Sequence, residues 1–71
     1  MATAFSLRLR RLRKNSSLTM DELARAAGIS KSYVWELENR EVPNLSAKVL
    51  VDLAKALDVT LQDLLGEPPP V

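Results

Sequence analysis

The polar residues best placed to bind a partner lie between Ile29 and Arg40. Ser32, Glu36 and Asn39 are spaced four and three residues apart, so in a helix they share one side. Lys31 flanks them. Hydroxyl, carboxylate, amide and ammonium groups donate and accept hydrogen bonds. This pattern therefore favours recognition of a hydrogen-bonding surface.

Other kinds of chemistry have little support in the sequence. The 71 residues include no Cys and no His, which excludes disulfides, thiolate nucleophiles, zinc-finger spacing and imidazole catalysis. Carboxylates do not cluster, and there is no Gly-rich phosphate loop. We expect no enzymatic activity, no cofactor, no metal and no small-molecule ligand. The apolar runs are too short to span a membrane and the N-terminus carries charges, so we expect a soluble, cytoplasmic protein.

The charge is unevenly distributed along the chain. The net charge is only +1, but residues 1–40 carry eight basic and four acidic groups. Residues 41–71 carry two basic and five acidic groups. The first part of the chain is therefore the one that attracts a polyanion.

The helix from Ile29 to Arg40 belongs to a predicted pair of helices. Thr19 and Glu22 form a capping box that starts the first helix of the pair. Gly28 supplies the left-handed residue that ends it, and Ser30 caps the second helix two residues later. So short a turn predicts a helix-turn-helix hairpin.

Three further helices complete the expected fold. The first spans residues 5–14, with Phe5, Leu9 and Leu12 on one apolar stripe. A fourth runs from the Ser46 cap to Leu57, and a short fifth runs from Thr60 to Leu65. We expect residues 1–66 to form one all-α domain and the Pro-rich residues 67–71 to form a tail or the start of a linker.

Two stretches of the sequence resemble a known family. Residues 9–39, LRRLRKNSSLTMDELARAAGISKSYVWELEN, are similar to the helix-turn-helix of the phage repressor and Cro type, the XRE family. Residues 53–65, LAKALDVTLQDLL, resemble the closing helices of that family. The resemblance covers residues 5–66 and implies a five-helix domain that binds double-stranded DNA. It also implies a homodimer on a palindromic operator and a role in transcription regulation, most often as a repressor.

The resemblance assigns roles to individual residues. Lys31, Ser32 and Glu36 match positions that reach base edges, where Lys suits guanine and Glu accepts from cytosine N4. The competing interpretation is a solvated helix face. The residues expected near the DNA backbone are Asn39, Thr19, Arg40 and Tyr33. Arg8, Arg10 and Arg11 are expected either to solubilise the first helix or to contact phosphates.

Other matching positions imply structural roles. Arg13 and Glu38 match a salt bridge that ties the first helix to the recognition helix. Trp35 is expected to pack against the loop at Val42 and Pro43 rather than to contact a thymine methyl or the sugar backbone.

The sequence also departs from the family pattern. Met20 stands where Gln is usual, which leaves one phosphate contact in doubt. Ser17 and Arg40 stand where Gly is common, so we expect left-handed backbone at both.

Two points stay open at the level of sequence. Val59, Leu61 and Leu65 are candidates for a dimer interface, and closing the core of one subunit is an equal alternative. A protein–protein module, antitoxin-like or adaptor-like, is the alternative function for the same fold.

Overall fold

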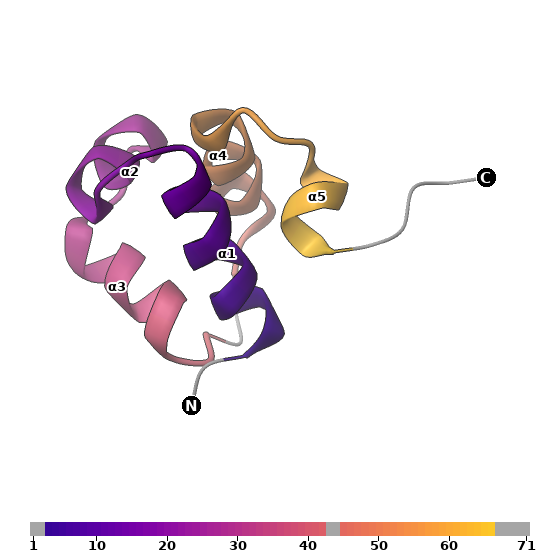
Figure 1. Cartoon of the computed structure of the whole chain (residues 1–71). Coiled ribbons are helices and arrows are strands. Elements are labelled where there is room, and N and C mark those ends of the chain that lie inside the picture. Colours follow the sequence, from indigo (N-terminus) through magenta and orange to yellow (C-terminus); the bar gives the residue numbers. More distant parts are fainter. Residues whose placement is uncertain (1–2, 43–44, 67–71) are drawn as a thin grey trace.

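The computed structural model describes residues 3–42 and 45–66, and these residues form five α-helices (Figure 1). The helices are α1 (Ala4–Asn15), α2 (Met20–Ala27), α3 (Lys31–Asn39), α4 (Ala47–Leu57) and α5 (Leu61–Leu65). No strand occurs in either described range. The expected all-α fold of five helices is therefore confirmed. None of the helices in these ranges is long and apolar enough to cross a membrane.

The helices enclose one hydrophobic core. α2 packs against α3 and α4, α1 packs against α3 and α5, and α4 packs against α5. In Figure 1, α2 and α3 lie on one side of α1 and α5 lies on the other. The apolar side chains buried in the core are Leu9, Leu23, Ala24, Ala27, Val34, Leu37, Leu53, Ala54, Leu57 and Leu64.

Each helix begins after a Thr or Ser that caps it. The cap side chain accepts a hydrogen bond from the backbone N–H three residues later, which satisfies a donor that the helix itself leaves unpaired. Thr3 caps α1, a position that the sequence had not suggested. A capping box closes at Thr19 with Glu22, as predicted, and a second one closes at Thr60 with Asp63. The hydrogen bonds with Thr19 lower the pKa of Glu22 below its usual value.

Four helices, α1, α2, α4 and α5, end at a residue in the left-handed conformation or next to one. Gly28 has φ 71° and Gly66 has φ 76°, and neither strains the backbone because glycine has no Cβ. Ser17, just after α1, has φ 58°, as expected. Asp58, which ends α4, has φ 55°, a feature that we had not predicted.

The expected left-handed conformation at Arg40 is wrong. Arg40 ends α3 in an extended conformation, with φ −134° and ψ 161°. Its N–H donates to the carbonyl of Glu36 at 2.8 Å, and its own carbonyl accepts from the buried Ser6 hydroxyl at 3.0 Å. The hydrogen bond from α1 therefore accompanies an extended exit from α3 that does not require glycine.

Contacts from α1 also hold the short helix α5. Arg8 donates from Nη1 to the carbonyl of Leu65 at 3.1 Å, and its guanidinium fills the space beside Gly66. Arg8 therefore stabilises the C-terminal end of α5, a role that was not among those expected for it.

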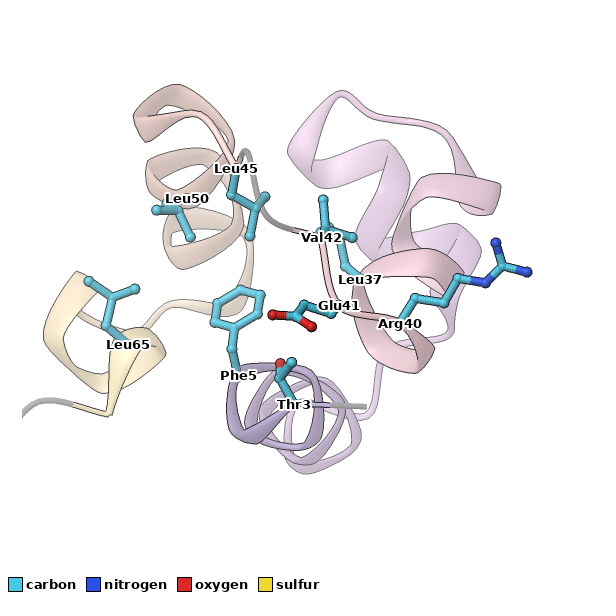
Figure 2. Close-up of a pocket in the computed structure, with 9 residues that line it drawn as sticks. All are labelled: Thr3, Phe5, Leu37, Arg40, Glu41, Val42, Leu45, Leu50 and Leu65. Carbon is cyan, nitrogen blue, oxygen red and sulfur yellow. The ribbon is translucent and has the colours of Figure 1, made fainter. Parts of the chain in front are cut away.

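An apolar groove opens where α1, α4, α5 and the segment after α3 meet. Figure 2 shows Phe5 pointing into it between Leu50, Leu65 and Val42. The groove has a volume of about 330 Å³. The segment after α3 also includes Pro43 and Asn44, which lie outside the described residues.

Candidate nucleic-acid interface

The turn between α2 and α3 sets the direction of α3. Ile29 donates its N–H to the carbonyl of Ala24 at 2.9 Å, which closes the end of α2 around the left-handed Gly28. The Ser30 hydroxyl then accepts from the N–H of Tyr33 at 3.0 Å and starts α3. Because both helix ends are hydrogen-bonded, the two helices are joined without a flexible linker.

One side of α3 is buried and the other is open. Val34, Leu37 and Glu38 are buried against the rest of the domain. Lys31, Ser32, Trp35 and Glu36 are exposed along the opposite side. The three residues predicted to reach base edges thus lie together on the accessible surface of α3.

Arg13 of α1 and Glu38 of α3 form a buried, two-pronged ion pair. Arg13 Nε lies 2.7 Å from Glu38 Oε2, and Arg13 Nη2 lies 3.0 Å from Glu38 Oε1. The remaining nitrogen, Nη1, donates to the carbonyl of Leu18 at 2.8 Å. A bidentate arginine fixes direction as well as distance. The expected salt bridge is therefore present and ties α3 to α1, and Arg13 also holds Leu18 at the end of the turn before α2.

The packing expected for Trp35 on the loop at Val42 and Pro43 stays a prediction, because Pro43 lies outside the described residues. Trp35 is 45% exposed, and the Arg40 guanidinium carbon lies 5.5 Å from the centre of its ring. This distance is within the range of a cation–π contact. Within the described residues, Arg40 therefore contacts the Trp35 ring.

Trp35 and Arg40 also line a shallow, open pocket on the exposed side of α3. Its other walls are Ser32 and Glu36, and its volume is about 190 Å³. Two of the residues predicted to contact bases thus line one concave site.

The residues expected near a DNA backbone differ in how exposed they are. Asn39 is half-buried and donates from Nδ2 to the carbonyl of Trp35 at 2.9 Å. Tyr33 is half-buried and packs against the core. Thr19 is exposed at the N-terminus of α2, where its hydroxyl accepts from the N–H of Glu22. Met20 packs against the core, so its side chain is not placed like a phosphate ligand.

Basic groups on α1 and α3 remain available for an anion. Arg10, Arg11 and Lys14 are exposed on α1, and Lys31 is exposed on α3. None of the four forms an ion pair with the residues that the structure describes. Arg25 of α2 is different, because it pairs with Asp21 at 3.2 Å on the surface.

The three candidates for a dimer interface differ in their surroundings. Val59 packs against the core, Leu65 lines the apolar groove, and Leu61 is 40% exposed. The residue of α5 that closes the core is Leu64, which is 0% exposed and which the sequence had not singled out. Leu61 is therefore the candidate most accessible to a second subunit.

A glycine turn joins α2 to α3, and a buried ion pair holds α3 with its polar side exposed. This arrangement defines a helix-turn-helix domain. A family model described as "Helix-turn-helix domain" matches residues 4–66. The chain belongs to this family, in agreement with the resemblance to the phage repressor and Cro type.

Relatives of known structure and function support this conclusion. The HTH-type transcriptional regulator SinR of Bacillus subtilis is 35% identical over 60 residues, which are 84% of this chain and 54% of SinR. The crystal structure of the restriction-modification controller protein C.AhdI from Aeromonas hydrophila superposes with a TM-score of 0.78 and 38% identity, over 84% of this chain and 89% of that one. The crystal structure of SinR in complex with DNA gives a TM-score of 0.79 and 33% identity, over 86% and 97% of the two chains.

The fold is thus the helix-turn-helix DNA-binding fold of transcriptional regulators. These relatives are regulators and not enzymes, in line with the expectation from the sequence. The chain spans about half the length of SinR, so functions of the whole SinR protein do not transfer to it directly.

Proposed function

We propose that this protein is a sequence-specific, double-stranded DNA-binding regulator of transcription that acts as a homodimeric repressor. The proposal rests on the exposed polar side of α3, a helix that the buried Arg13–Glu38 ion pair holds in place. α3 would enter the major groove, with the side chains of Lys31, Ser32 and Glu36 at base edges. Lys31 would donate to guanine O6 and N7, and Glu36 would accept from cytosine N4.

The surroundings of α3 support contacts with the DNA backbone. Arg40 and Asn39 lie at the C-terminal end of α3, and Thr19 lies at the N-terminus of α2, where backbone N–H groups favour a phosphate. Tyr33 would contribute its hydroxyl. Arg40 lines the same pocket as Glu36, and its positive charge offsets the repulsion between that carboxylate and the DNA.

We infer that dimerisation uses the surface around α5. Leu61 is exposed there, and α5 lies on the opposite side of α1 from α3 (Figure 1), so both surfaces can be used at once. A two-fold dimer would place its two α3 helices about 34 Å apart, one turn of DNA, on a palindromic operator. Occupancy of that operator would then block polymerase. In this proposal, residues 1–66 are the DNA-binding domain. The protein would act in the cytoplasm.

The apolar groove favours a second function, a protein–protein module of the antitoxin or adaptor kind. The groove exposes Phe5, Val42, Leu45 and Leu65 to a cavity of about 330 Å³, which an apolar side chain of a partner could fill. The two functions differ in their response to salt. Binding to several phosphates weakens steeply with salt, with a log–log slope of about −0.9 per phosphate neutralised, whereas filling of an apolar groove does not.

Selection of binding sites from random duplexes tests the main proposal. We expect a palindromic consensus with half-sites one helical turn apart, and failure to recover a consensus would contradict the proposal. Lys31→Ala and Ser32→Ala should each relax preference at one base position, at a cost of about 1–3 kcal/mol for a good contact. Lys55→Ala, which removes an exposed charge from α4, is the matched control and should leave base preference unchanged.

A further inference from the structure

The exposure of Trp35 needs an explanation that the contacts proposed above do not give. Trp35 is the only tryptophan of the chain, and the residue is 45% exposed even with Arg40 over its ring. Within the described residues, it is the one large apolar side chain that is exposed on α3. It therefore presents an apolar surface in the middle of the polar side of that helix.

Arg40 holds this surface in a defined place. The backbone of Arg40 is hydrogen-bonded on both sides, to the carbonyl of Glu36 and to the hydroxyl of Ser6. Figure 2 shows its side chain running away from the apolar groove. The guanidinium reaches the indole ring of Trp35. Arg40 thus contacts the ring and lines the same pocket as Trp35.

The pocket combines one apolar wall with groups that form hydrogen bonds. Trp35 supplies the indole, Glu36 a carboxylate acceptor and Ser32 a small hydroxyl, around a volume of about 190 Å³. On the major-groove edge of DNA, the apolar group is the methyl at C5 of a pyrimidine, present in thymine and in 5-methylcytosine. The carboxylate favours the cytosine type, because cytosine has an N4 donor beside C5 where thymine has the O4 acceptor.

We propose that the pocket formed by Ser32, Trp35, Glu36 and Arg40 binds the C5-methyl group of a pyrimidine in the major groove. The proposal rests on the proposed function, because it requires α3 to enter that groove. Trp35 is the residue that buries the methyl, Glu36 selects the base that carries it, and Arg40 positions the indole. Burial of one methyl group corresponds to about a fourfold gain in affinity.

The experiment uses the full chain and the duplex consensus obtained from site selection. In one set of duplexes, each thymine is replaced in turn by deoxyuridine, which lacks the methyl. In the other, each cytosine is replaced in turn by 5-methylcytosine, which gains it. Binding is measured by fluorescence anisotropy for the wild type, Trp35→Ala, Glu36→Ala and Leu7→Ala. Leu7→Ala is the matched control, because Leu7 is an exposed apolar residue on α1 with 58% of its surface accessible.

We expect one position in each half-site at which the methyl group changes affinity about fourfold. A gain on adding the methyl to cytosine identifies 5-methylcytosine as the ligand, and a loss on removing it from thymine identifies thymine. Trp35→Ala should abolish the effect and Leu7→Ala should preserve it. Glu36→Ala should preserve the methyl effect and relax the choice between cytosine and thymine.

Two results would overturn the inference and leave the proposed function standing. One is normal duplex binding that responds to no methyl group at any position. The other is a methyl effect of the same size in Trp35→Ala, with the helical circular dichroism of the variant unchanged. Absence of sequence-specific, salt-dependent duplex binding would instead remove the proposed function, and the inference with it.

Discussion

Replacement of Glu38 by alanine should reduce the free energy of unfolding more than any exposed charge substitution. The Arg13 and Glu38 side chains are 10% and 0% exposed, and two hydrogen bonds join them. Glu38→Ala leaves the Arg13 guanidinium in the interior without its partner. Removal of one member of a buried pair costs about 3–5 kcal/mol.

The expected loss is large for a domain of this size. A chain of 71 residues has a total free energy of unfolding of roughly 4–11 kcal/mol, so Glu38→Ala should remove about a quarter of it or more. The melting temperature should fall by at least about 12 °C, at roughly 4 °C or more per kcal/mol for a domain this small. Arg13→Met combined with Glu38→Leu should recover most of the loss, because no charge then remains buried.

Urea unfolding followed by helical circular dichroism measures these differences. Arg25→Ala is the matched control, since it breaks an exposed pair with Asp21 on α2 and should cost no more than about 0.5 kcal/mol. If Glu38→Ala costs no more than Arg25→Ala, the buried pair does not anchor α3 and the reasoning is refuted. If the double replacement is as unstable as Glu38→Ala, the loss does not come from an unpaired charge.

Three further outcomes are expected. Ser17→Gly should stabilise the domain by up to about 1 kcal/mol in urea unfolding, because the backbone there has φ 58°; a lower midpoint would argue against strain at this residue. Gly66→Ala should lower the thermal midpoint, because alanine is strained at φ 76° and its Cβ would displace the flexible Arg8 guanidinium; adding Arg8→Ala should not restore the midpoint, since the strain at φ 76° remains. The pKa of Glu22 is lowered by its hydrogen bonds with Thr19, so its contribution to stability is present above its usual pKa and is lost as pH falls through the lowered value. Glu22→Gln should therefore lose less stability than the wild type on acidification. Equal losses in the two proteins would contradict a lowered pKa of Glu22 in the folded state.

Local signals in the sequence predicted the helices well. Thr19, Ser30, Ser46 and Thr60 each precede a helix and cap it by a hydrogen bond to a residue three positions later, so a short stretch of sequence contains the whole interaction. The left-handed turn at Gly28 is local in the same sense. Element boundaries and types could therefore be predicted from neighbouring residues.

Contacts between distant residues could not be predicted in this way. Ser6 donates to the carbonyl of Arg40 and Arg8 donates to that of Leu65, across separations of 34 and 57 residues. The wrong expectation for Arg40 follows from the first of these, because its extended conformation accompanies a hydrogen bond from another helix. The pair of Arg13 and Glu38 is also distant, and only the family resemblance indicated it.

The candidate site was predicted in part. The exposed positions of Lys31, Ser32 and Glu36 follow from the helical period alone. The surroundings of Trp35 do not follow from the helical period, because the position of Arg40 beside the ring depends on how the chain leaves α3. In α5, five residues are too few for a period to identify Leu64 as the buried one.

The division of α3 into two sets of positions has a consequence for how such a protein can diversify. Val34, Leu37 and Glu38 fix the helix to the domain, and a different set of residues forms its open surface. Substitutions on the open surface leave the anchor intact, so they are close to neutral for folding. A gene duplicate could therefore acquire a new target by a few exposed substitutions, each tolerated in turn. For the same reason, α3 is a suitable site for randomised libraries, in which most members should still fold.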